Sequence, residues 1–183
     1  MGVVIEVLQW YNTFVVNTSF ISLVFIKLLS YIFPIEIYNS SKNLIRWLIV
    51  FSGFTNIIYI IYDAINSDEI SFISRATGPY AAVYWIMIIV SCLLPFTLLI
   101  NKVKDKGWAI FVISVVISAG WFFEQFVIKT TSNHMDYQGT SGSGWLISFL
   151  PIDILINGVV QGVLITGTSI IIVKYRNATI NKA

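Results

Sequence analysis

Apolar residues gather in five long runs along this chain, and short polar segments separate them. The runs cover about 13–33, 44–62, 81–100, 108–128 and 154–173. Each run is close to the ~20 residues that an α-helix needs to cross ~30 Å of hydrocarbon. The pattern therefore predicts an all-α membrane protein in which residues 1–183 form one bundle of about five transmembrane helices.

The first run is the least regular of the five. It ends at Pro34, and residues 1–12 before it are expected to form an interfacial helix, with Trp10 and Tyr11 at the level of the lipid headgroups. Polar side chains interrupt its apolar pattern at Asn17, Thr18, Ser19 and Lys27.

Composition supports the membrane class. Charged residues make up 11% of the chain and apolar residues 57%, whereas soluble domains carry about 25% charged residues. Membrane lipid is therefore the expected surrounding, and the net charge of +2 gives no argument for nucleic acid as a partner. The lone cysteine, Cys92, is interpreted as a small packing residue, and no metal site is predicted.

The charges divide between the two faces that five crossings would create. The face holding the segments 34–43 and 101–107 and the C-terminal tail carries most of the cations: Lys42, Arg46, Lys102, Lys104, Lys106, Lys174, Arg176 and Lys182, with Lys27 close by. The opposite face carries most of the acids: Glu6, Asp63, Asp68, Glu69, Glu124, Asp136 and Asp153. The positive-inside rule then predicts an N-terminus outside and a cytoplasmic C-terminus.

Two residues near the end of the fourth run are candidates for proton chemistry. Glu124 is an acid within an apolar run, and such carboxylates are functional candidates by default. A structural ion pair with Arg75 or Lys129 explains it equally well. His134, the only histidine, is expected in a loop at 131–136, where it would exchange protons or serve as a docking residue.

Other positions predict helix geometry. Tyr80, Tyr84 and Trp85 follow Gly78-Pro79 and are expected in an aromatic belt at the outer interface. Pro95 should kink the third helix. The fifth run contains Gly158-x-x-x-Gly162, whose spacing lets helices approach closely, and Asn157 and Gln161 are placed to hydrogen-bond across that interface.

Three segments resemble one known family. The run 75–85, RATGPYAAVYW, looks like the "GPYA..YW" helix start of the polysulfide-reductase membrane-anchor (NrfD-like) family. The run 122–136, FFEQFVIKTTSNHMD, is similar without gaps to "WFERFVIIVTSLHRD" in the quinol-oxidising membrane subunit of alternative complex III. Residues 151–155, PIDIL, look like that subunit's "TPVEIL".

The resemblance covers the C-terminal half of that family and implies a membrane subunit of a respiratory quinol-linked oxidoreductase in the inner membrane of a bacterium. Its implied partners are an iron–sulfur subunit on the outer face and a second multi-helix subunit, or an N-terminal bundle. No cofactor would be bound by this chain alone, and quinone would bind in the complex. Gln125 and Met135 stand where the family has arginines.

The same resemblance implies roles for individual residues. Glu124, His134 and Asp136 would be proton-linked or docking residues, and Arg75, Tyr80 and Tyr84 would belong to the quinone or partner environment.

Two alternatives stay open at this point. The chain would otherwise be a structural assembly subunit or truncated paralogue without a redox role, or a small transporter or channel subunit. We rank the transporter last because the sequence predicts neither an inverted repeat nor a broken helix pair, the features that mark a substrate site at mid-membrane.

Overall fold

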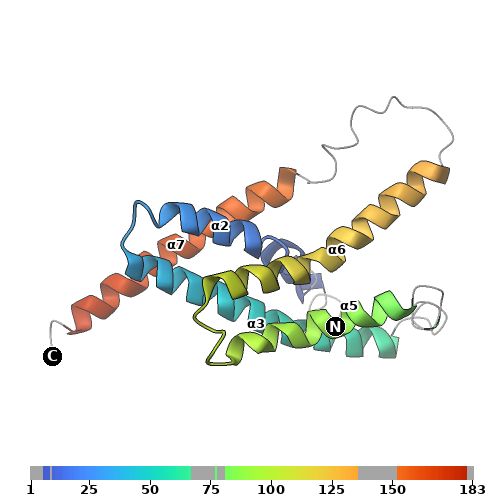
Figure 1. Ribbon diagram of the computed structural model, residues 1–183, viewed down its shortest axis with the longest axis horizontal. Coiled ribbons are helices and arrows are strands. Elements are labelled where there is room, and N and C mark those ends of the chain that lie inside the picture. The colour runs from blue at the N-terminus through green and yellow to red at the C-terminus, as the bar shows by residue number, and fades with distance from the viewer. Residues whose placement is uncertain (1–5, 9, 67–76, 78–80, 136–151, 181–183) are drawn as a thin grey trace.

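The computed structural model describes residues 6–8, 10–66, 77, 81–135 and 152–180, and these form helices joined by short turns (Figure 1). No strand occurs among them, which confirms the all-α class. The elements are η1 (a π-helix, Tyr11–Val16), α2 (Ser19–Leu29), α3 (Ile35–Asn66), α5 (Ala81–Leu93), η2 (a 3₁₀ helix, Leu94–Leu99), α6 (Gly107–Met135) and α7 (Ile152–Ile180).

The long helices alternate in direction. The end of α2, the beginnings of α3 and α6, and the end of α7 gather at one end of the bundle (Figure 1, left). Helix α2 packs mainly on α7 and α3, while α5 and η2 pack along α3. Ile26, Ile45, Ile49 and Ile110 lie fully buried where these helices meet.

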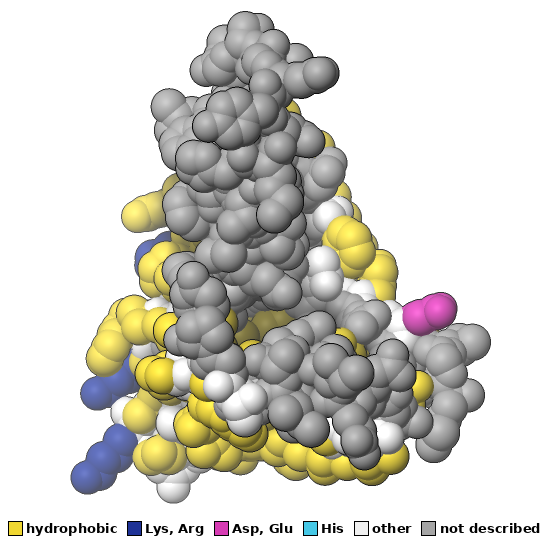
Figure 2. Space-filling view, turned by 90° about the vertical axis from the view of Figure 1, so that its right-hand side faces the viewer, with side chains coloured by type: hydrophobic (Ala, Val, Ile, Leu, Met, Phe, Trp, Pro, Cys, Tyr) yellow, Lys and Arg dark blue, Asp and Glu magenta, His cyan; other side chains and the backbone are white. Residues whose placement is uncertain are grey.

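Polar and apolar side chains are distributed as a lipid-facing bundle requires. Helix α3 exposes a stripe of large apolar residues, Trp47, Phe51, Phe54, Ile58 and Ile61, and buries the small polar residues Ser41, Ser52 and Thr55. Hydrophobic side chains are also spread over the described part of the face in Figure 2. Because hydrocarbon cannot hydrogen-bond, polar groups are favoured inside such a bundle and apolar groups outside.

Three helices are long and apolar enough to cross a membrane: Ile35–Tyr62, Ala81–Leu99 and Ile154–Thr179. The bent pair Glu6–Val16 and Ser19–Leu29 makes a fourth if it is one span. In α6, the described apolar segment Gly107–Gly120 is shorter than a span. The described residues therefore give three or four candidate spans, against the five that the apolar runs predict.

Two expected loop positions prove to be helical. Helix α3 begins at Ile35, so the segment 34–43 is not a loop, and Lys42 lies within the helix. Pro34 suits this start, because its carbonyl accepts a hydrogen bond from the Ile37 N–H at 3.0 Å. Helix α6 continues to Met135, so the loop position expected for His134 is wrong. No glycine or proline occurs between Gly120 and Met135 to end it.

The third predicted helix agrees closely with the structure. Its predicted span, 81–100, matches α5 followed by η2, which together end at Leu99. The kink expected at Pro95 takes the form of the change from α-helix to 3₁₀ helix at Leu94, since proline cannot donate the backbone hydrogen bond that an α-helix needs.

The first predicted helix, 13–33, is not continuous. The chain runs as a π-helix to Val16 and resumes as α2 at Ser19, with a bend of 41° between the two pieces. At the bend, the Ser19 hydroxyl donates to the Val15 carbonyl at 2.7 Å, and the Thr18 hydroxyl oxygen lies 2.7 Å from the Phe14 carbonyl oxygen. Hydroxyls that bond to carbonyls of the preceding turn bend helices. The expectation that the chain lacks a broken helix pair is therefore wrong.

Candidate functional site

The predicted outer residues are only partly described. Arg75, Tyr80 and Asp136 lie outside the described residues. Glu124 and His134 both lie on α6, so a helical rise of 1.5 Å per residue separates their backbones by about 15 Å along the axis. Tyr84 is half-buried in the first turn of α5, and its ring meets that of Trp85 edge-on at 6.0 Å.

Helices α5 and α6 adjoin at this end of the bundle. A Cβ atom on Gly120 of α6 would lie 3.8 Å from Cγ of Met87 in α5, which is ordinary van der Waals contact. The ring of Phe122 meets that of Phe20 in α2 at 6.2 Å. The backbone position of Glu124, two residues further on, is thus just beyond the contact of α6 with α2.

A polar cluster inside the bundle surrounds the break in the first helix. The Thr18 and Ser22 hydroxyls donate to Oε1 of Gln161 at 2.6 and 2.8 Å, and Nε2 of Gln161 donates to the Val15 carbonyl at 3.1 Å. We call Thr18, Ser22 and Gln161 the break cluster. Helix α7 thereby supplies a second donor to the Val15 carbonyl, which also accepts the Ser19 hydroxyl. Hydrocarbon can supply no donor there.

A second polar chain links the π-helix to α3 and α5. Nδ2 of Asn12 donates to Oδ1 of Asn56 at 2.7 Å, and the Thr55 hydroxyl donates to Oδ1 of Asn12 at 3.2 Å. Nδ2 of Asn56 donates in turn to the Ser91 carbonyl at 3.1 Å. These bonds hold η1, α3 and α5 together.

Tyr11 belongs to the bundle interior. Its hydroxyl donates to the Leu48 carbonyl at 2.6 Å and its ring meets Phe51 edge-on at 5.5 Å. Leu48 lies near the middle of the 32-residue helix α3. Tyr11 therefore joins η1 to the central part of α3, and its level relative to the lipid headgroups stays a prediction.

Two glycines let α7 approach α2 closely, as their spacing predicts. A Cβ atom on Gly158 would lie 2.6 Å from Cβ of Ile21, and one on Gly162 would lie 2.8 Å from Cδ1 of Phe25. Both distances are too short for a real contact, so only glycine permits this separation of the helices. The close approach brings the Gln161 amide within reach of Thr18 and Ser22.

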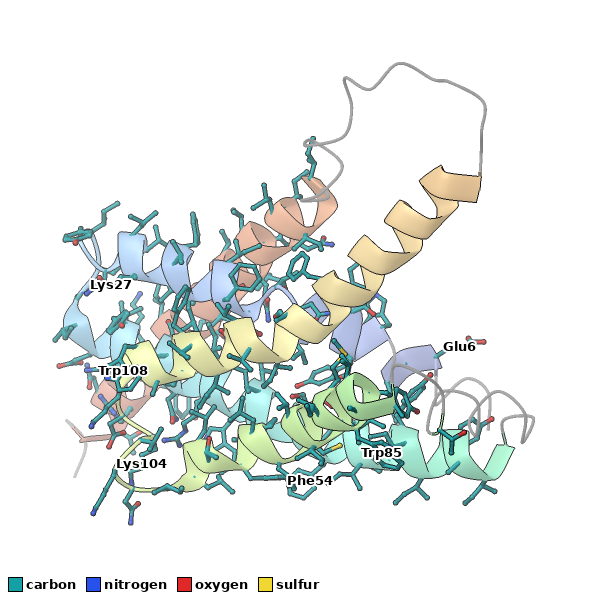
Figure 3. All side chains as sticks on the ribbon, turned by 45° about the vertical axis from the view of Figure 1, so that its right-hand side comes forward. Glu6, Lys27, Phe54, Trp85, Lys104 and Trp108 are labelled. Carbon is teal, nitrogen blue, oxygen red and sulfur yellow. The ribbon has the colours of Figure 1, made fainter. Side chains whose placement is uncertain are left out.

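Charge gathers at the ends of the bundle. Lys27, Lys104 and Trp108 lie at one end, and Glu6 and Trp85 at the other (Figure 3). Within the described ranges, the one ion pair joins Arg176 to Glu36 at 3.9 Å between largely exposed side chains. The same ranges contain no group of three His, Cys, Asp or Glu side chains that would hold a metal ion.

Sequence reasoning identified one member of the break cluster and missed its partners. Gln161 was expected to bond across a helix interface, and it does. Thr18 was taken as an interruption of an apolar run and Ser22 was not singled out, although their spacing of four residues places both on one helix face. The four-residue spacing of Thr18 and Ser22, which face the Gly158–Gly162 pair of α7, was the sequence feature that could have predicted the break cluster.

Comparison with known proteins gives no relative: no family model, no curated protein and no solved structure matches this chain.

Proposed function

We propose that this chain is a multi-pass membrane subunit with five crossings, an outer N-terminus and a cytoplasmic C-terminus. The alternating helix directions support this, because they bring Lys27 and Lys104 to one end of the bundle and Glu6 to the other (Figure 3). Single cysteines in a Cys92→Ala background test it: an impermeant maleimide added to intact cells should label Glu6→Cys and spare Lys104→Cys. The reverse labelling would overturn the orientation.

We propose further that the chain serves in a quinol-linked oxidoreductase of a bacterial inner membrane. The observation that carries this proposal is the ungapped similarity over residues 122–136, where Glu124 and His134 share one helix, α6. An iron–sulfur protein would dock at the outer end of the bundle, and a second multi-helix subunit would complete the quinone environment.

In this proposal the residues divide into two groups. Glu124, His134 and Asp136 exchange protons with quinol or contact the docked partner. Arg75, Tyr80 and Tyr84 belong to the quinone or partner environment. A carboxylate near the membrane surface can carry its charge at moderate cost and can exchange a proton there. An unperturbed histidine side chain changes charge between about pH 5 and 8.

Purification of the tagged chain from its native membrane in mild detergent tests the assembly. Co-purification of an iron–sulfur protein and a second multi-helix subunit is expected. In the purified complex, Glu124→Gln and His134→Ala should each lower quinol-dependent electron transfer, while the adjacent controls Gln125→Ala and Asn133→Ala should not. An intact complex in which all four variants keep full activity would leave an assembly subunit without a redox role.

A transporter or channel subunit is the second candidate, and the broken first helix favours it. Discontinuous helices with polar groups at the break form substrate sites in several transporter folds, and here Thr18, Ser22 and Gln161 surround such a break. Proteoliposomes containing only this chain test the idea. Solute or ion flux that Gln161→Leu abolishes would favour transport, and the absence of flux would remove this candidate.

A further inference from the structure

We propose that Lys27 and Lys42, which lie near the Tyr38 ring, and Arg46, one turn further along α3, bind the phosphate of an anionic phospholipid headgroup at the basic end of the bundle. We call these four residues the headgroup site. It is separate from the outer end that the proposed function uses, because α2 ends and α3 begins here (Figure 3).

Two lysines from different helices converge on one aromatic ring. Nζ of Lys27, on α2, lies 5.1 Å from the centroid of the Tyr38 ring, and Nζ of Lys42, on α3, lies 5.7 Å from it. Ammonium groups held near a ring face are attracted by its negative charge. Tyr38 thus brings together two cations that would otherwise repel each other.

Neutral groups orient Lys42. Its ammonium donates to the carbonyl of Asp105 at 2.9 Å and to Oδ1 of Asn39 at 3.4 Å. An ammonium group has three donors, so one stays available after these two bonds. Gly107 permits the arrangement, because a Cβ atom there would lie 3.0 Å from the Tyr38 hydroxyl and 3.6 Å from Cδ of Lys42.

Arg46 adds a donor that lacks an acceptor. It follows Lys42 by four residues and so lies on the same face of α3. Its Nε is buried and has no hydrogen-bond partner within the described part of the chain, while its guanidinium lies 5.3 Å from the Trp47 ring. A buried donor without an acceptor is costly, and a phosphate oxygen is a strong acceptor for guanidinium.

The acids at this end do not neutralise the site. Glu36 lies 3.9 Å from Arg176, and Asp105 offers Lys42 its backbone carbonyl. None of Lys27, Lys42 and Arg46 forms an ion pair with a described residue. Among the described residues, three positive charges therefore lack a counter-ion, which is the condition under which an anion binds.

Apolar surface beside the site indicates a lipid as the source of the phosphate. Leu28, Trp47 and Trp108 are all largely exposed. In the sequence they directly follow Lys27, Arg46 and Gly107, respectively. Exposed tryptophan is typical of the membrane interface. A headgroup held by the three cations would lay its acyl chains along this surface, whereas free phosphate would have no use for it.

Native mass spectrometry of the detergent-purified protein tests the proposal, with phosphatidylglycerol and phosphatidylcholine as probes. One phosphatidylglycerol per chain should survive at detergent concentrations that strip phosphatidylcholine. Lys27→Gln and Lys42→Gln should each weaken phosphatidylglycerol binding about fivefold, the effect of one cation at an anionic lipid surface. Arg46→Lys, which keeps the charge but lacks Nε, should also weaken it.

The matched control removes two charges from the same end of the bundle. Lys102→Gln/Lys104→Gln should leave phosphatidylglycerol binding unchanged. Equal loss in this control and in Lys27→Gln/Lys42→Gln would overturn the site in favour of diffuse attraction. Equal retention of the two lipids, or displacement of phosphatidylglycerol by inorganic phosphate at equal concentration, would overturn the choice of an anionic lipid.

Discussion

Oε1 of Gln161 accepts a hydrogen bond from the Thr18 hydroxyl at 2.6 Å, joining α7 to the break in the first helix. The two residues are 143 positions apart in the sequence. Regular backbone hydrogen bonding is interrupted at this point of the first helix. The amide of Gln161 supplies an acceptor to the Thr18 and Ser22 hydroxyls and a donor to the Val15 carbonyl. The bent helix is thus stabilised by a neighbouring helix.

Replacing Gln161 by leucine should destabilise the bundle by about 1 kcal/mol, the scale of an interhelical hydrogen bond in a membrane protein. The Val15 carbonyl would keep the Ser19 hydroxyl but lose its second side-chain donor. The Thr18 hydroxyl would fall back on the Phe14 carbonyl, and the Ser22 hydroxyl on the Gly158 carbonyl. Reversible unfolding in mixed micelles measures the change. Thr168→Val is the control, because that hydroxyl bonds only within α7; an equal loss in both variants would contradict the role of Gln161.

Adding a methyl group at Gly158 should separate α2 from α7. The new Cβ atom would lie 2.6 Å from Cβ of Ile21, which is attached directly to the backbone and cannot rotate away. We expect Gly158→Ala to cost about 1–3 kcal/mol, as overpacking does. Gly167→Ala is the matched control, since no described side chain and no other helix lies within 4 Å of a Cβ atom placed there, and it should be neutral or slightly stabilising. Similar unfolding free energies for the two variants would argue against the close approach.

The apolar runs locate the helices better than they locate the helix ends. Hydropathy marks only the part of a helix that lies in hydrocarbon, so α3 and α6 extend beyond the predicted ranges until a breaker or a turn stops them. The Pro95 irregularity and the Gly158–Gly162 approach follow from local chemistry and were predictable. The contact of Thr18 with Gln161 was not predictable, because the pattern of apolar and polar residues along the chain does not reveal which helices become neighbours.

The Asn12–Asn56 pair should show coupling that single substitutions cannot reveal. Asn12 also accepts a hydrogen bond from Thr55, and Asn56 also donates to the Ser91 carbonyl. Either alanine variant therefore leaves some of these hydrogen-bonding groups without a partner from the pair. A double-mutant cycle of Asn12→Ala and Asn56→Ala should give an interaction energy of about 1 kcal/mol. Asn12→Ala combined with Thr168→Val should be additive. Additivity in the first cycle would mean that the 2.7 Å bond contributes nothing to stability.

Cys92 provides a direct measure of how tightly α5 packs on α3. Its side chain is buried, and its carbonyl oxygen would lie 3.1 Å from a Cβ atom placed on Gly53, with Cζ of Phe96 at 3.0 Å from the same atom. Gly53→Ala should therefore displace either the Phe96 ring or the backbone at Cys92. Movement of the backbone would open a path to the thiol.

We expect alkylation of Cys92 by a small maleimide in detergent to be several-fold faster in Gly53→Ala than in the parent protein, since a free-energy change of about 1 kcal/mol in local opening alters the exposed population about fivefold. Gly120→Ala is the control, because its Cβ would make only ordinary contact with Met87 on another part of α5. Unchanged alkylation in Gly53→Ala would show that Phe96 alone moves and that the backbone contact between the two helices tolerates a methyl group.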